Sequence, residues 1–137
     1  PDAVAAYGTK GPSGCYDHIT AHYPYQKPIT VTAQCGWLMQ KGFGFEMRFH
    51  IVLEKASIVY TSNHSPTLTV YSDKRDSYNP DLSGYQDGMA NEINHFIMCI
   101  TDEKASKIIS PEQSRNSVKI ICAEINSANM RKEIVLK

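Results

Sequence analysis

The chain lacks a long apolar run and has no excess of charge of one sign. No apolar stretch approaches the length of about 20 residues that a membrane-spanning helix needs. No basic segment followed by an apolar one, typical of a secretory signal, opens the chain. The 14 basic and 14 acidic residues cancel, so no overall field attracts nucleic acid or an anionic membrane. We therefore expect a cytoplasmic protein that binds neither nucleic acid nor membranes.

Several motifs that carry chemistry are also missing. None of the glycines forms the GxGxxG turn of a dinucleotide site or the GxxxxGK[S/T] loop of a nucleoside triphosphate site, so we expect no cofactor bound by this chain itself. The four cysteines are scattered with no CxxC pair and stand where core residues are expected, which predicts buried, reduced thiols. His18 and His22 would lie about 13 Å apart along a strand, too far to share a zinc ion. We expect no metal site and no catalytic residue.

Two long stretches alternate between apolar and polar residues. The apolar positions are Ile29, Val31, Ala33, Cys35, Trp37 and Met39 in the first stretch and Phe43, Phe45, Met47, Phe49, Ile51 and Leu53 in the second. A period of two predicts strands that are buried on one face only. Further strands are expected at 2–9, 15–23, 57–61, 67–71 and 133–136, with short turns that favour antiparallel neighbours.

Two amphipathic helices are expected after the strands. Apolar residues at helical spacing follow a long polar loop over 73–86; they are Met89, Ile93, Phe96, Ile97 and Ile100. Ser110 and Gln113 can form a capping box around Pro111, which predicts the start of a second helix. The 137 residues then predict one α+β domain spanning 1–137. We expect a large, mostly antiparallel, open-faced sheet of about six or seven strands, with two helices packed on one face.

The sheet face without helices is the candidate contact surface. It is expected to carry Thr30, Thr32, Gln34, Glu46, Arg48 and His50. Tyr16, His18, Thr20 and His22 join it or line the end of the sheet if the second strand continues the pattern. Such a face is either plain solvated surface or a wet, isologous interface between copies of the chain. We expect a homo-oligomer that uses this face.

Five segments occur in an order and at a spacing that resemble a known family. They are Gly14-Cys15-Tyr16-Asp17-His18-Ile19, Cys35-Gly36-Trp37, Gly42-Phe43-Gly44-Phe45-Glu46-Met47-Arg48-Phe49, the stretch 91–100 and the segment that begins Ser110-Pro111-Glu112. Together they cover nearly all of the chain. They resemble the C-terminal domain of the Gfo/Idh/MocA oxidoreductases, the group of glucose–fructose oxidoreductase and inositol dehydrogenase.

The resemblance implies the second half of a two-domain enzyme. The parent would carry an N-terminal Rossmann domain that binds NAD or NADP, and would transfer a hydride from a sugar or polyol. The chain starts at Pro1 without a methionine, so we expect a fragment that lacks that domain and is inactive alone. The catalytic histidine and aspartate of the family have no counterpart here, and Asp17-His18 does not match them.

The resemblance also implies three residues that line the substrate site of the parent. They are Phe45, at the start of a long strand, and Tyr85 with Gln86, in the loop before the first helix. Phe45 lacks the hydroxyl that some relatives use there, and a core position suits it equally well. The alternative function is a free-standing, non-enzymatic sheet module for assembly or ligand binding.

Overall fold

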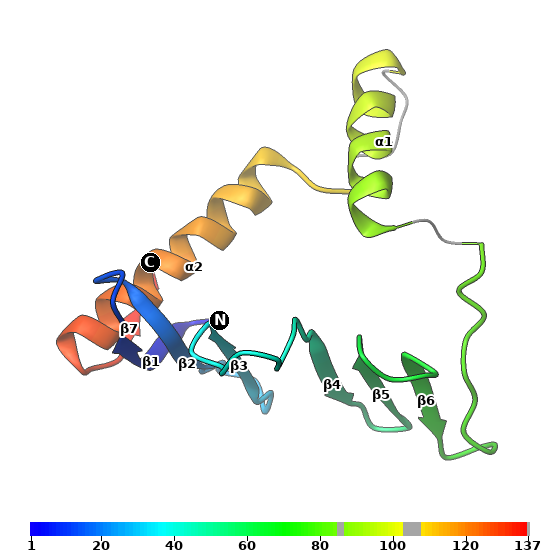
Figure 1. The fold of residues 1–137 in the computed structure, drawn as a ribbon, viewed down its shortest axis with the longest axis horizontal. Coiled ribbons are helices and arrows are strands. Elements are labelled where there is room, and N and C mark those ends of the chain that lie inside the picture. Colours follow the sequence, from blue (N-terminus) through cyan, green and yellow to red (C-terminus); the bar gives the residue numbers. More distant parts are fainter. Residues whose placement is uncertain (85–86, 103–107, 137) are drawn as a thin grey trace. The chain divides into compact units, whose positions relative to one another are not determined.

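A computed structural model of the chain describes residues 1–84, 87–102 and 108–136. The chain divides into two compact units. The first is Pro1–Gln40 with Lys107–Lys137, and the second is Lys41–Ser106. The described residues form seven strands and two helices (Figure 1). The α+β class is confirmed, but the strands are divided between two antiparallel sheets, of four and three strands, instead of one sheet of six or seven.

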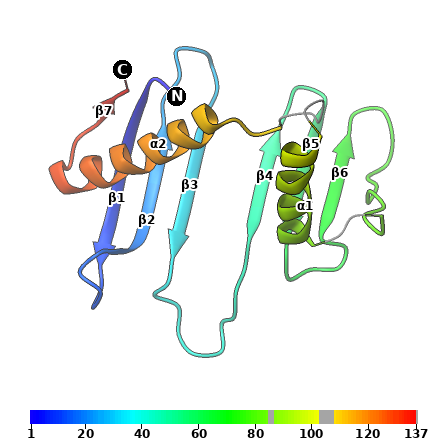
Figure 2. The same ribbon diagram turned by 90° about the horizontal axis from the view of Figure 1, so that it is seen from above.

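The first unit is a four-stranded sheet with one helix against it. Its strands are β1 (Ala3–Lys10), β2 (Tyr16–Tyr23), β3 (Val31–Gly36) and the short β7 (Ile134–Val135), in the order β3-β2-β1-β7. Helix α2 (Pro111–Met130) packs against β1 and β7 (Figure 2). It begins with the expected capping box: the side chain of Ser110 accepts from Gln113 N–H, and the Gln113 side chain accepts from Ser110 N–H.

Small side chains hold α2 close to the sheet. The core cluster consists of Val4, Ala6, Ala21, Ala123 and Ala128. Alanine at four of these five positions lets the helix backbone approach β1 and β2 closely, since no longer side chain separates the two layers. Larger residues, among them Ile19, Tyr23 and Ile120, pack around this cluster and remain partly exposed.

Ser127 joins the helix to the strand by hydrogen bonds. Its side chain, in a residue only 1% exposed, accepts from the Ala6 N–H at 2.9 Å and donates to the Lys132 carbonyl at 2.6 Å. One hydroxyl therefore satisfies a strand donor and an acceptor just beyond the end of α2, where Arg131 adopts a left-handed conformation (φ 52°).

A bulge in β2 changes the face on which Tyr16 lies. Thr9 pairs with His18 and Lys10 pairs with Tyr16, so Asp17 is the extra residue between the two pairs. The shift turns the Tyr16 side chain toward α2, where its hydroxyl donates to Asn129 Oδ1 at 3.0 Å. Glycine at position 8 leaves room for the Tyr16 ring, because a Cβ at that position would lie 2.7 Å from the ring.

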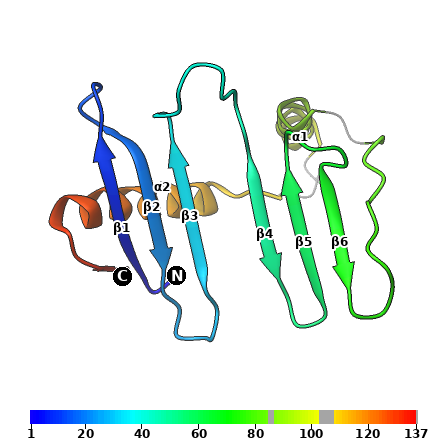
Figure 3. The same cartoon turned by 60° about the horizontal axis from the view of Figure 1, so that its bottom comes forward.

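The second unit contains a three-stranded antiparallel sheet. Its strands are β4 (Arg48–Val52), β5 (Ala56–Thr61) and β6 (Leu68–Ser72), in that order (Figure 3). Phe49 and Tyr60 are cross-strand partners, and their rings stack with centroids 5.2 Å apart. Helix α1 (Gly88–Thr101) follows a long connection. The expected packing of a helix on a sheet is present for α2, whereas α1 has no buried residue.

Both long predicted strands are shorter in the structure. The stretch 29–39 is a strand only over β3, and 43–53 only over β4. Gly44 interrupts the second stretch, because its φ of 76° lies in the left-handed region, and Gly42 just before the stretch has a φ of 95°. The described residues 37–47 form no strand, and β3 and β4 pair only within their own sheets.

No helix in the described part of the chain is long and apolar enough to cross a membrane.

Replacing Ser127 with alanine tests the contact between α2 and β1. Ser127→Ala leaves the buried Ala6 N–H without its partner, so we expect the free energy of unfolding to fall by about 1–3 kcal/mol. Urea unfolding followed by circular dichroism measures the change. The control is Ser117→Ala, which removes an exposed hydroxyl that bonds only to the Gln113 carbonyl of the same helix. Equal loss in both variants would contradict the role of Ser127.

Candidate functional site

On the face opposite α2, nine residues of β1, β2 and β3 form three cross-strand rows. Because directly paired residues in an antiparallel sheet point to the same side, the register defines the rows. They are Ala5–His22–Thr32, Tyr7–Thr20–Gln34 and Thr9–His18–Gly36. We call these nine residues the open face.

The open face has no fixed charge and is largely exposed. It contains no aspartate, glutamate, lysine or arginine, and its only imidazoles are those of His18 and His22. Tyr7 is 65% exposed, and Thr20 and Thr32 are exposed as well. Tyrosine, threonine and glutamine are amphipathic side chains that form direct or water-mediated contacts with a partner surface.

A hydrogen bond orients the His18 ring on this face. Its Nε2 lies 3.2 Å from Gln34 Nε2 on the neighbouring strand. An amide N–H donates to a neutral imidazole nitrogen, so this arrangement fits an unprotonated Nε2. Gly36 lies next to the other ring nitrogen: a Cβ at position 36 would be 2.5 Å from His18 Nδ1. Glycine at position 36 therefore makes room for the ring.

The opposite face of the sheet packs against α2 along β1 and β7, while β3 is exposed. The Tyr23 hydroxyl donates to Glu124 Oε1 on α2 at 2.6 Å. Burial raises the pKa of Tyr23 well above its usual range, and the hydrogen bond to the Glu124 carboxylate raises it further. This pair links β2 to the helix, so it stabilises the fold and is not available to a ligand on the open face.

The six predicted contact residues fall into two groups. Thr32 and Gln34 lie on the open face, and Thr30 is exposed just before β3. Arg48 and His50 lie on β4 of the second sheet, with Glu46 before them, and Arg48 Nε is 4.0 Å from Glu46 Oε1. Each group belongs to its own sheet. Tyr16 was expected on this face or at the end of the sheet; it is the first residue of β2 and its side chain points toward α2, not to the open face, while His18, Thr20 and His22 lie on the open face as the alternation predicts.

The structure describes one of the three predicted substrate-lining residues. Phe45 is 67% exposed and lies before β4, next to the left-handed Gly44. It is therefore not a core residue of the second unit. Tyr85 and Gln86 lie outside the described residues, and their predicted role stays a prediction.

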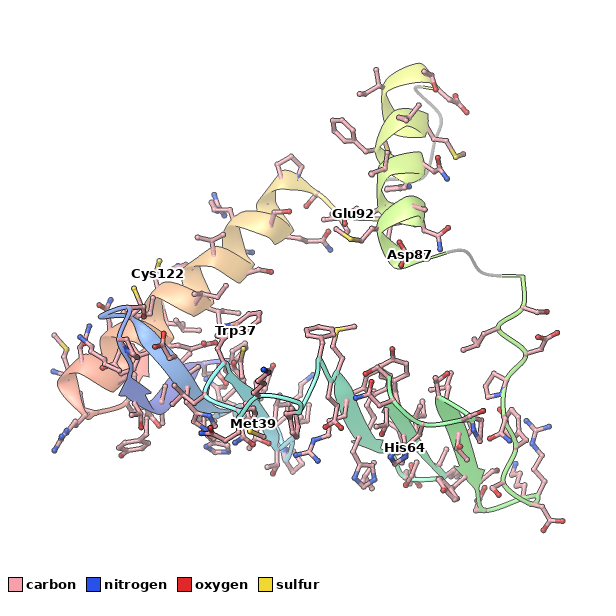
Figure 4. All side chains as sticks on the ribbon, in the orientation of Figure 1. Trp37, Met39, His64, Asp87, Glu92 and Cys122 are labelled. Carbon is pink, nitrogen blue, oxygen red and sulfur yellow. The ribbon has the colours of Figure 1, made fainter. Side chains whose placement is uncertain are left out.

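A polar hollow lies on the β5–β6 hairpin. It has a volume of about 490 Å³, and its lining includes Thr61, His64, Thr69 and Tyr71. Of these residues, His64 is labelled in Figure 4. Thr69 Oγ1 is already engaged, since it donates to Asn79 Oδ1 at 2.9 Å. The lining contains no carboxylate, lysine or arginine, and none of its residues is buried. Such a surface can hold a small polar molecule but offers no desolvated acid or base for a reaction.

The cysteines differ from the expected buried thiols. Cys15, Cys35 and Cys122 are exposed and Cys99 is partly buried, and all four are free. Cys99 Sγ lies 3.5 Å from His95 Nε2 one turn earlier on α1. Within the described residues, no group of three or more histidine, cysteine, aspartate or glutamate side chains is placed to hold a metal ion.

Apolar side chains are exposed on the α2 side of the first unit. Trp37, which follows β3, is 76% exposed, and Cys122 is exposed on α2 (Figure 4). Val118, Ile121 and Ile125 on α2 are exposed too. Exposed apolar groups of this extent are typical of surfaces that contact another protein or domain.

Sequence reasoning did not place Tyr7 and Thr9 on the open face. Strand β1 reads Ala-Val-Ala-Ala-Tyr-Gly-Thr-Lys, in which small residues occupy both faces and hide the alternation. The even positions Val4 and Ala6 are buried against α2, so Tyr7 and Thr9 belong to the other side. Knowing which β1 residues the helix covers would have identified them.

No protein-family model matches the chain, and comparisons with curated proteins and with solved structures found no match either.

Replacing Gly36 with alanine tests the position of the His18 ring. The added methyl of Gly36→Ala would overlap His18 Nδ1, so we expect the ring to turn and its hydrogen bond to Gln34 to be lost. Imidazole NMR resonances of His18 should shift, while those of His50 on the second sheet should not. In the control, Gly84→Ala, the methyl meets nothing within 4 Å. An unshifted His18 in Gly36→Ala would contradict the geometry.

Proposed function

We propose that this chain is an assembly domain whose open face binds the same face of a second copy. The observation that carries the proposal is the set of three aligned rows, nine positions without a fixed charge, on a sheet that packs against α2 with its other face at β1 and β7. Two copies related by a two-fold axis would place identical neutral, amphipathic side chains against each other. That is what an isologous interface requires.

The size of the open face predicts weak binding. Three neighbouring strands span about 14 Å, and a strand of eight residues is about 26 Å long. The flat area is then well below the roughly 800 Å² that each partner buries in a standard interface. We therefore expect a dissociation constant in the micromolar range, with water at many of the contacts.

The resemblance to the Gfo/Idh/MocA oxidoreductases supports a wider proposal. On this reading the chain is the substrate-side and oligomerisation domain of an NAD(P)-dependent enzyme that oxidises a sugar or polyol. The exposed apolar residues beside α2, among them Trp37 and Ile121, would offer the Rossmann domain of the parent a surface to pack against. Without that domain, the assembly role alone remains, as in a free-standing, non-enzymatic module.

Self-association is tested by sedimentation velocity at tens of micromolar and pH 8. We expect a species of twice the chain mass of 15.3 kDa. Thr20 lies in the middle row on the central strand, so Thr20→Glu should bury like charges at the contact and give monomers. Ser114→Glu adds the same charge on α2 and should leave the dimer intact. A monomeric wild-type protein would contradict the assembly proposal.

Calorimetry with NAD and NADP tests the wider proposal. We expect no binding by this chain, whose described residues form no phosphate-binding turn at a helix start, and binding by the full-length parent. Binding by neither protein would leave the non-enzymatic assembly module as the function. Binding by this chain alone would contradict both readings.

A further inference from the structure

We propose that protonation of His18 and His22 controls self-association, so that the dimer forms at neutral or higher pH and separates in mild acid. The inference rests on the proposed function, because it concerns the same open face. Its basis is the arrangement of titratable groups on that face.

The two imidazoles are the only groups of the open face that change charge between pH 5 and 8. The residues paired with His22 are Ala5 and Thr32, and those paired with His18 are Thr9 and Gly36. The remaining three positions hold Tyr7, Thr20 and Gln34. Neither adjacent strand therefore presents a carboxylate on this face to offset a protonated ring.

The nearest charged residues along the chain are engaged elsewhere. Asp17 Oδ1 accepts from Ser13 Oγ at 2.6 Å, and Asp2 Oδ2 accepts from Gln26 N–H at 2.7 Å. Lys10 Nζ lies 5.1 Å from the centre of the Tyr16 ring, and the bulge turns the Tyr16 side chain toward α2. The open face therefore has no fixed charge, and it carries two positive charges per copy when both rings are protonated.

A two-fold contact brings these charges together. If the two-fold axis passes over Thr20 and runs parallel to β2, His18 of one copy lies opposite His18 of the other copy. If the axis passes over Thr20 and runs perpendicular to β2 in the plane of the contact, His18 of one copy lies opposite His22 of the other. Stacked sheets lie about 10 Å apart, so the side chains of the two faces interleave. In either arrangement imidazoles of one copy approach imidazoles of the other, and like charges at a poorly solvated contact disfavour the complex.

The Gln34 contact adds to the preference for the neutral ring. Gln34 Nε2 is placed 3.2 Å from His18 Nε2, an arrangement in which the amide donates to an unprotonated nitrogen. Protonation replaces this acceptor with an N–H, so the amide must turn to present its oxygen. A packed interface restricts that rotation, whereas an exposed face does not.

The expected size of the effect follows from the number of protons released. If the contact requires one neutral ring per copy, two protons must leave when the dimer forms from protonated chains, so the dissociation constant rises by up to about a hundredfold for each pH unit of acidification, by linkage. A micromolar dimer that weakens a hundredfold is mostly monomeric at tens of micromolar.

Sedimentation velocity at pH 8.0 and pH 5.5 tests the inference. We expect the wild type to be dimeric at the first pH and monomeric at the second, and the double variant His18→Gln/His22→Gln to stay dimeric at both. The controls His64→Gln and His95→Gln change imidazoles of the second unit and should behave as the wild type.

The outcomes separate this inference from the proposed function. A wild type that is monomeric at pH 8.0 overturns the assembly proposal and this inference with it. A wild type that stays dimeric at pH 5.5, or a double variant that still separates in acid, overturns the inference alone.

A second measurement remains decisive if the double variant does not fold. NMR titration of the wild-type imidazoles at low and high protein concentration should give lower pKa values for His18 and His22 at the high concentration. Values that do not depend on concentration would overturn the inference.

Discussion

The antiparallel register of β1, β2 and β3 is the constraint on which the rest of this account depends. Because side chains alternate strictly between the two faces of a strand, one register assigns every residue to a side. Val4, Ala6 and Ala21 lie beneath α2, and this placement puts Tyr7, His18, Thr20 and Gln34 together on the other side. A shift of β2 by one residue against β1 would turn Ala21 out of the core and His18 and His22 toward α2, and a shift of β3 would move Thr32 and Gln34 off this face.

The first unit has one helix, which packs on one of the two faces of its sheet, so the open face on the other side is largely exposed. Alanines hold α2 close to the sheet, and Ser127 fixes it by two hydrogen bonds. Nothing among the described elements of the unit packs on the open face in the same way. On the assembly proposal, this flat and amphipathic surface is the part of the unit that contacts a second copy.

Particular residues show how far the sequence predicts this structure. The capping box of Ser110 and Gln113 predicts the start of α2 to the residue, because its chemistry is local. Alternation predicts the strands and the face of His18, Thr20 and His22, since a period of two is also a local signal. The two-sheet arrangement was not predicted, because the choice of which strands pair is not a local signal in the sequence. The left-handed conformations of Gly42 and Gly44 were not predicted either, since glycine permits such conformations without requiring them.

The candidate site was predictable only in part, for a related reason. Thr32 and Gln34 follow from the alternation of β3, but Tyr16 does not lie on the open face, because the bulge at Asp17 reverses its face through pairing with a distant strand. Tyr7 was missed because the faces of β1 differ only after α2 has covered one of them. The substrate-lining role of Phe45, Tyr85 and Gln86, the NAD or NADP of the parent and the missing Rossmann domain remain predictions from the resemblance.

The most direct test of the central claim is an isotope-filtered NMR experiment on a mixture of labelled and unlabelled protein, which detects only contacts between copies. The account predicts intermolecular signals from the Tyr7 ring and the methyl groups of Thr20 and Thr32. Intermolecular signals that arise only from α2 residues such as Ile121, with none from the open face, would contradict it.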